Sequence, residues 1–306
     1  MAARSSTPGG MSFGRRLRRM HDLPWAVLFL APSFLGFAVF TLFPVLYSAY
    51  LSFVDWNLIR DPVWVGFENY RQAFNDPLFW KVMRNTVYYT AGSVPLGMAL
   101  SLGLAVLLNR KLRGVEILRT LYFLPVVSSG VAVAMVWRWL YEPNFGLINY
   151  VLSLVGIDPI GWLTTTEWAM PAIILMSVWK GLGQSMVIFL AGLQSIPRQL
   201  YEAAEIDGAS RWQQFWDITR PLLSPTTFFV LVISIIGSFQ VFSQVYVMTN
   251  GGPANSTSTI VYYIYQKGFN EFQMGYASTL SWLLFAVIFA FTLLQMRLQR
   301  NWVTYD

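Results

Sequence analysis

Six apolar stretches, each long enough to cross a lipid bilayer, constrain the fold of this 306-residue chain more than any other feature. A helix needs about 20 residues to span the hydrocarbon core, where it satisfies its own backbone hydrogen bonds. Only 12% of the residues are charged, about half the usual share of a soluble domain. We therefore expect an all-α membrane protein with six spans, near residues 25–48, 86–108, 120–140, 168–190, 226–248 and 275–296.

Lysine and arginine gather in particular segments outside these spans. Most of the 21 basic residues lie in the N-terminal tail, in the loops 109–119 and 195–221, and after the last span. Because cytoplasmic loops of membrane proteins carry an excess of Lys and Arg, we expect both termini and these loops to be cytoplasmic. We expect residues 1–20 to form a flexible basic tail and residues 21–306 a single six-span transmembrane domain.

Several classes of function are disfavoured by what the chain does not contain. It has no cysteine and one histidine, so neither a metal site nor a Ser/His/Asp triad is expected. No lysine is followed by Ser or Thr, so the chain has no P-loop and should not bind or hydrolyse ATP itself. The basic residues lie at span ends rather than on one face, which argues against nucleic acid. The six spans contain no Asp or Glu, which makes an ion-coupled secondary transporter a remote alternative.

The loop 195–221 is polar although it lies between two strongly apolar stretches. Pro197 suits a helix start, residues 198–206 are compatible with a helix, and Gly208 breaks it. A second short helix should run from Ala209 toward Thr219 and stop at Pro221. The sequence thus predicts two short helices bent at a glycine.

Two interpretations of this helix pair remain open from the residues alone. Glu202 and Glu205 are three residues apart and share a face that can project carboxylates toward a cationic partner, while small alanines between them permit close approach. In the other interpretation the pair lies in the headgroup layer, with its acids merely solvated and its aromatic residues in the membrane interface: Trp212, Phe215 and Trp216.

The order and spacing of the residues in this loop resemble the "EAA" signature of the permease subunits of bacterial ABC importers. The matching positions are Glu202-Ala203-Ala204, Asp207-Gly208-Ala209, Phe215, Pro221 and Pro225. The likeness extends to residues 65–70, 178–181, 193–197, 249–253 and 275–278. Together these segments resemble the carbohydrate-uptake branch, in particular the compact six-span relatives of the maltose and glycerol-3-phosphate permease subunits.

The resemblance implies a fold, partners and a role for the loop. In that family the signature forms a cytoplasmic coupling helix between spans four and five, which sits in a cleft of an ATPase. It assigns coupling to Glu202, Ala203, Ala204, Glu205, Asp207, Gly208 and Ala209, with Glu202 meeting an arginine. The implied partners are a second, homologous permease, an ATPase dimer that binds ATP and Mg, and an extracytoplasmic solute-binding protein. The implied location is the bacterial inner membrane.

Polar residues within the spans predict a substrate path, because polar groups at membrane depth are costly unless they line a cavity or bond a neighbouring helix. Aligned on the signature, positions resembling the family's sugar-binding ones carry Ser177, Trp179, Lys180, Gly181, Gln184, Ser234, Ser238 and Val241. Trp179 could stack on a sugar ring, and Lys180 could bind hydroxyls or a phosphate. Each serine could instead simply bond a helix carbonyl. We expect a sugar as the solute, with glycerol-3-phosphate or another phosphorylated polyol as the alternative.

Overall fold

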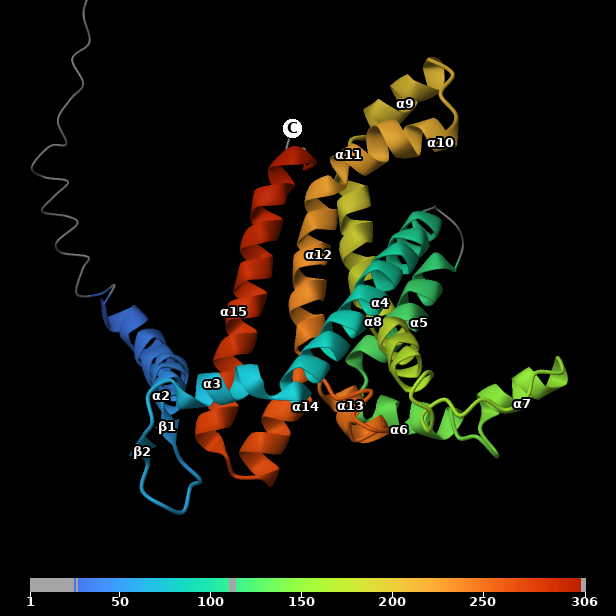
Figure 1. Cartoon of the computed structure of the whole chain (residues 1–306). Helices are drawn as coiled ribbons and strands as arrows, with labels where there is room; N and C mark the ends of the chain where they lie inside the picture. The colour runs from blue at the N-terminus through green and yellow to red at the C-terminus, as the bar shows by residue number, and fades with distance from the viewer. Residues whose placement is uncertain (1–24, 26, 110–113, 304–306) are drawn as a thin grey trace, which may run out of the picture.

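The computed structural model describes residues 25, 27–109 and 114–303, and this part of the chain is predominantly helical (Figure 1). The tail expected at residues 1–20 lies outside the described residues. Four described helices are long and apolar enough to cross a membrane: Val27–Leu51, α4 (Pro77–Leu108), α8 (Ala169–Ser195) and α15 (Met274–Leu298). The first includes a π-helical turn, η1 (Ala38–Leu42), followed by α2 (Phe43–Leu51). Two bent helix pairs would raise the number of spans among the described residues to six.

The stretch expected to span the membrane at residues 120–140 is not a single helix. It is divided between α5 (Val115–Val127) and α6 (Gly130–Leu140), whose axes meet at 99°. The break lies at Ser128, whose backbone is extended and whose hydroxyl donates to the Leu124 carbonyl at 3.0 Å. Because the side chain takes over this carbonyl, the helix can end here without losing the bond. α6 therefore runs across the end of the bundle (Figure 1).

The stretch expected to span the membrane at residues 226–248 is also interrupted. It begins in α12 (Ser224–Phe239), and α13 (Ser243–Met248) follows only after a three-residue break. Within the break, the Val241 carbonyl accepts a hydrogen bond from the Thr259 hydroxyl at 3.0 Å. This bond gives a buried carbonyl a partner outside the helix, which helps the chain to tolerate the break.

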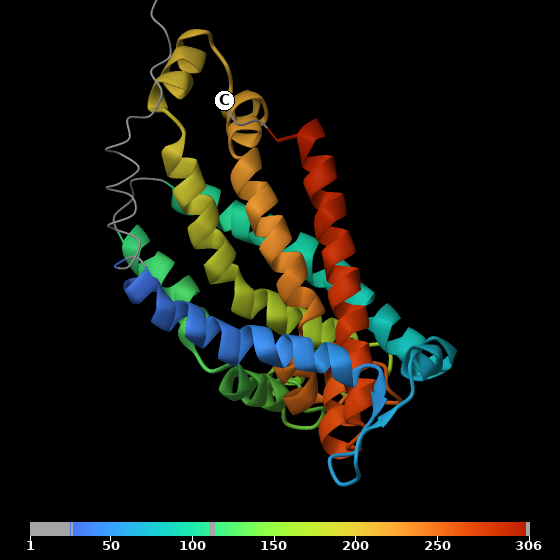
Figure 2. The same cartoon turned by 90° about the vertical axis from the view of Figure 1, so that its left-hand side faces the viewer.

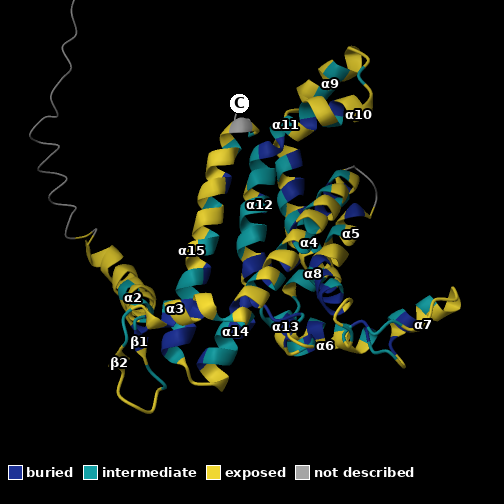
Figure 3. Cartoon of the chain, viewed as in Figure 1, coloured by how far each residue is buried: buried dark blue, intermediate teal, exposed yellow. Residues whose placement is uncertain are grey.

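α8 lies at the centre of the bundle and packs along α4 and α5. Gly183 on α8 faces the backbone of α5, because a Cβ atom at this position would lie 2.3 Å from the Tyr122 carbonyl oxygen. Small residues allow such close approach between membrane helices. α8 contains many of the buried side chains, whereas the first helix and much of α15 expose their apolar faces (Figure 3). Such outer faces suit contact with lipid or a partner subunit.

One end of the molecule carries a hairpin and several short helices, and the other end carries the loop 195–221 (Figure 2). The first end has the hairpin of β1 (Val54–Asp55) and β2 (Val63–Trp64), with α3 (Glu68–Asn75), α7 (Leu147–Leu154), α14 (Ile260–Tyr265) and η3 (Gln266–Asn270). The opposite end carries α9 (Arg198–Ile206), α10 (Arg211–Gln214), η2 (Phe215–Thr219), α11 (Arg220–Leu222) and the C-terminal turn η4 (Gln299–Asn301).

Candidate functional site

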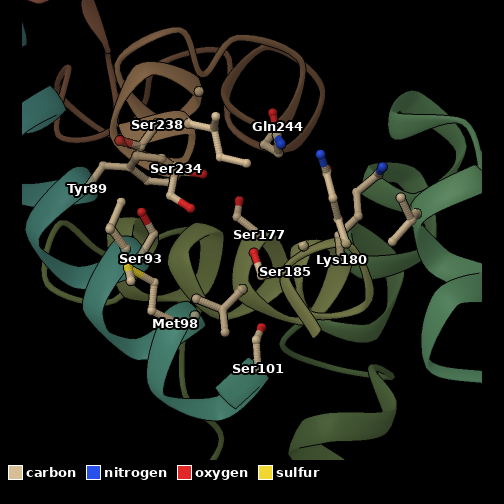
Figure 4. Close-up of a pocket in the computed structure, with 18 residues that line it drawn as sticks. Tyr89, Ser93, Met98, Ser101, Ser177, Lys180, Ser185, Ser234, Ser238 and Gln244 are labelled. Carbon is tan, nitrogen blue, oxygen red and sulfur yellow. The ribbon is translucent and has the colours of Figure 1, made fainter. Parts of the chain in front are cut away.

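A cavity of about 440 Å³ lies between the central portions of α4, α8 and α12 (Figure 4). Serine side chains from all three helices line it, together with the amide groups of Gln184 and Gln244. Lys180 is the only charged residue among the described lining residues. The cavity therefore offers mainly hydroxyl and amide groups, which can both donate and accept hydrogen bonds.

Most of the residues predicted for a substrate path line this one cavity. On α8 the spacing of i, i+3, i+4 and i+7 places four side chains along one face, as expected for a helix. α12 supplies the serines opposite them. The six residues brought together in this way are Ser177, Lys180, Gly181, Gln184, Ser234 and Ser238.

The remaining two predicted residues, Trp179 and Val241, do not line the cavity. Trp179 lies on a neighbouring face of α8 and its ring packs 5.5 Å from the ring of Trp137 on α6. Val241 is only 5% exposed and belongs to an apolar cluster. α12 ends at Phe239, so Val241 does not continue the helix face that carries Ser234 and Ser238. Trp179 and Val241 therefore lie outside this cavity.

α4 forms a wall of the cavity that the sequence reasoning missed. Tyr89, Ser93, Gly97 and Ser101 follow one another at intervals of four residues and all line the cavity. This spacing places small or polar groups along one side of an apolar helix, and it was a signal available in the sequence. The Ser101 hydroxyl donates to the Leu182 carbonyl on α8 at 3.1 Å.

The serine hydroxyls differ in how far their hydrogen bonds are already satisfied. Ser238 donates to the Ile235 carbonyl at 2.8 Å and lies 3.0 Å from the hydroxyl of Thr90. The Ser93 Oγ, by contrast, is buried and forms no hydrogen bond of ordinary length within the described chain, although the Tyr89 hydroxyl lies near it. A buried hydroxyl without a full hydrogen bond loses free energy relative to water. Ser93 is thus a wall hydroxyl that can gain from a ligand.

Lys180 lies near the middle of α8 and points toward the break between α5 and α6. A Cβ atom built on Gly130 would lie 3.9 Å from the Lys180 Cε. Within the described chain no hydrogen bond or ion pair engages the Lys180 ammonium group. An unpaired ammonium at membrane depth is costly, and such groups commonly mark a solute path or a partner in another subunit.

The loop 195–221 contains the predicted pair of helices bent at a glycine. α9 ends where Gly208 adopts a φ of +80°, in the left-handed region. The Ala209 N–H donates to the Ala204 carbonyl at 2.8 Å across this turn. A residue in the left-handed conformation after a helix end, with this bond closing the turn, is the usual way to satisfy the last carbonyls.

The second helix of the loop begins later and ends later than expected. The Ser210 hydroxyl accepts from the Gln213 N–H, and the Gln213 side chain accepts from the Ser210 N–H at 2.8 Å, so a capping box starts the helix. The helix does not stop at Pro221. A π-helical turn, η2, widens the backbone just before the proline, so the helical path continues through α11 to Leu222.

The first part of the signature, residues 202–209, lies on α9 and in the turn after it, where the loop projects from the bundle (Figure 1). The carboxylates of Glu202 and Glu205 are exposed and no described residue pairs with them. Ile206 is 86% exposed beside them, and Leu200 is also exposed. A projecting helix that presents both acids and apolar side chains is poorly matched to water and suits contact with another protein. Tyr201 bonds Thr219 at 2.9 Å and holds the two helices of the loop together.

Comparisons with known proteins agree on one kind of molecule. Residues 93–303 match the family "binding-protein-dependent transport system inner membrane component". The lactose transport system permease protein LacF of Rhizobium radiobacter is 38% identical over 93% of this chain and 97% of its own length. The arabinooligosaccharides transport system permease protein AraP of Bacillus subtilis is 36% identical over 89% and 87%. A crystal structure of a bacterial alginate ABC transporter, in complex with a periplasmic protein bound to an alginate pentasaccharide, contains a chain with a TM-score of 0.81. That chain is 26% identical, with 94% of this chain and 97% of that chain covered.

Proposed function

Because this chain belongs to the family of binding-protein-dependent transport system inner membrane components, we propose that it forms half of the translocation path of an ATP-driven sugar importer. The cavity between α4, α8 and α12 carries this proposal. Its serine hydroxyls and glutamine amides can exchange hydrogen bonds with sugar hydroxyls, and it lies on the central portions of helices that are long enough to span the membrane. The named relatives LacF and AraP are permeases for sugars, which supports the same class of solute here.

A second permease completes the path in this proposal. Lys180 lines the cavity and has no partner among the described residues, and the first membrane helix exposes its apolar side chains. A homologous subunit would pack against this chain as a pseudo-symmetric heterodimer. An extracytoplasmic solute-binding protein would deliver the sugar. The alginate transporter, in complex with a periplasmic protein that holds an alginate pentasaccharide, supports a partner of this kind.

ATP would act through the projecting loop. Glu202, Ala203, Ala204 and Glu205 on α9, with the turn Asp207-Gly208-Ala209, would seat in the cleft of a separate ATPase dimer that binds ATP and Mg. The exposed carboxylates and the rigid turn at Gly208 support this assignment. Closure of the ATPase would then move the loop as a rigid body and rock the attached helices α8 and α12 between inward- and outward-facing states.

Reconstitution tests the function directly. The chain would be assembled in proteoliposomes with the second permease, the ATPase and the solute-binding protein of the same transporter. We expect sugar uptake that requires both ATP and the binding protein. Uptake driven by an ion gradient without ATP would contradict the proposal and favour a secondary transporter.

A phosphorylated polyol is the second candidate solute, and Lys180 is the observation that favours it. An ammonium group without a partner in a neutral, hydroxyl-lined cavity would pair well with a phosphate. Lys180→Gln should then reduce uptake of a phosphorylated solute far more than uptake of a neutral sugar. An equal effect on both solutes would indicate that Lys180 pairs with the second permease instead.

A further inference from the structure

A second cavity, of about 640 Å³, lies at the same end of the molecule as the loop 195–221. It is bordered by α11 and the start of α12 on one side and by the residues that follow α15 on the other. Two arginines line it, Arg220 from α11 and Arg300 from η4, although they are 80 positions apart in the sequence. We call this the two-arginine cavity. It is separate from the serine-lined cavity and shares no lining residue with it.

The charge of the two-arginine cavity is not neutralised by the residues that the structure describes. No Asp or Glu lines it, and neither guanidinium forms an ion pair within the described chain. The hydroxyls of Ser224 and Thr227 lie in the same wall. Guanidinium groups have a fork of donors that fits phosphate oxygens. The two hydroxyls donate to the Pro221 and Leu223 carbonyls, so the arginines are the donors that this cavity offers to an anion.

One contact restrains the Arg220 side chain, and another restrains the segment that carries Arg300. The Arg220 guanidinium lies over the Trp216 ring, 5.1 Å from its centroid, and this cation–π contact restricts the side chain. Arg300 lies two residues before Trp302. The ring centroid of Trp302 lies 6.1 Å from that of Phe228 on α12, in an edge-to-face arrangement. The segment carrying Arg300 is therefore packed against the helix that starts beside Arg220.

The position of the cavity favours a membrane lipid over another anion. It lies where α12 begins and where α15 ends, and both helices belong to candidate membrane spans. Tryptophans at such helix ends, here Trp216 and Trp302, are typical of the headgroup layer. Basic pockets between membrane helices at this level bind lipid phosphates. The tip of α9, where a protein partner would dock, projects away from this point (Figure 1).

We infer that the two-arginine cavity binds the phosphate of an anionic phospholipid in the leaflet that faces the loop 195–221. Arg220 and Arg300 each donate to the phosphate oxygens, and Thr227 borders the glycerol end of the headgroup. The bound phosphate ties α11, the last part of the loop, to the end of α15. It thereby stiffens the joint at Leu223, where the path bends by 64° into α12.

Lipid binding can be measured on the whole chain without any partner protein. The chain would be purified from membranes and placed in nanodiscs of phosphatidylcholine with or without phosphatidylglycerol, and retained lipid would be counted by native mass spectrometry. We expect Arg220→Gln and Arg300→Gln each to weaken phosphatidylglycerol retention at least about tenfold, because each removes a charge-assisted bond. Arg297→Gln is the matched control: it lies on the last turn of α15 but does not line the cavity, and it should retain the lipid.

Further measurements distinguish the lipid from other anionic groups that could occupy the cavity. If inorganic phosphate binds the cavity in phosphatidylcholine discs as well as the lipid does, the site belongs to free phosphate and the lipid proposal is overturned. Full lipid retention by the Arg220→Gln/Arg300→Gln double variant would also overturn it. If the double variant loses ATPase binding in phosphatidylcholine discs, the arginines meet the ATPase rather than a lipid. Because retention is measured on the isolated chain, failure here leaves the proposed transport function standing.

Discussion

At the scale of single residues, the serines that line the cavity have two different roles. Some hydroxyls bond the backbone and stabilise the fold, whereas another can bond a ligand. Ser101 donates its hydrogen to the Leu182 carbonyl, which joins α4 to α8. Ser93, eight residues earlier on the same helix face, has a buried Oγ that forms no hydrogen bond of ordinary length within the described chain. The two serines are chemically identical, so they form a natural pair for testing which role each one has.

We expect Ser93→Ala to leave stability unchanged or slightly raised, because it removes a buried group that lacks a full hydrogen bond. The same change should raise the KM for sugar about tenfold if the hydroxyl bonds the solute. Ser101→Ala should instead lower the free energy of unfolding by about 0.5–1.5 kcal/mol, since it leaves the Leu182 carbonyl without this donor. Thermal unfolding in detergent and uptake kinetics would measure both. A normal KM for Ser93→Ala would remove this residue from the path.

Trp179 lies on the predicted helix but outside the serine-lined cavity. Its position in α8 follows from the apolar run, but its ring packs on Trp137 of α6. Because the sequence predicted one continuous span across residues 120–140, it provided no reason to expect α6 beside this face. From the structure, we expect Trp179→Ala to loosen the contact between α6 and α8 rather than to weaken sugar binding.

At the scale of elements, the turn between α9 and α10 depends on one backbone conformation. Gly208 has a φ of +80°, and a Cβ atom there would meet no described atom within 4 Å. Gly208→Val should therefore act through backbone strain, at a cost of about 1–2 kcal/mol, and Gly208→Asn should cost less because asparagine tolerates this region. We expect the valine variant to insert normally but to couple poorly to the ATPase. Equal ATPase stimulation in both variants would contradict this strain argument.

Glu202 tests the coupling role of α9 itself. Its exposed carboxylate has no described partner, so Glu202→Ala should not change the stability of the bundle. If the carboxylate meets an arginine of the ATPase, the change should weaken docking by roughly 1.5–3 kcal/mol. Sugar-stimulated ATPase activity and uptake would be measured together, with Glu205→Ala as the neighbouring comparison. Wild-type values in Glu202→Ala, Glu205→Ala and Gly208→Val alike would show that this loop does not couple.

The end of the molecule opposite the loop 195–221 has its own polar contacts, which tie the start of α4 to α14 and α15. The Asp76 carboxylate caps α4 through the Leu78 N–H at 2.8 Å and accepts bonds from the hydroxyls of Tyr263 and Tyr276. Burial raises the pKa of Asp76, but these hydrogen bonds outweigh burial and hold its pKa below the ordinary value.

We expect Asp76→Asn to lower the free energy of unfolding by about 1–3 kcal/mol at neutral pH, because a charged acceptor of two tyrosine bonds is lost. Since the folded pKa of Asp76 is depressed, its contribution is complete above the unfolded pKa and disappears as the pH falls through the folded pKa. The difference between the wild type and Asp76→Asn should therefore shrink in acid. A difference that stays constant from pH 7 to pH 3 would show that the carboxylate charge is not responsible.

At the scale of the whole molecule, the absence of cysteine allows the topology to be tested without first removing native thiols. Ile59, in the hairpin between β1 and β2, is 86% exposed, and Asp217 in the loop 195–221 is also exposed. We expect Ile59→Cys to react with a membrane-impermeant maleimide in intact cells, and Asp217→Cys to react only after the membrane is opened. Labelling of Asp217→Cys in sealed cells would reverse the orientation expected from the positive-inside rule.

Local sequence patterns were enough to predict the membrane as the solvent of this protein, its helical class and the short loop with the family signature. These properties depend on the length of the apolar runs, on the positions of Lys and Arg, and on Gly208, where the chain must turn. The path of α6 and the presence of Arg220 and Arg300 at one cavity became apparent only in the folded chain. Each of them depends on which helix faces pack together across distant parts of the chain, and an apolar run has the same pattern whether it crosses the membrane or bends along its surface.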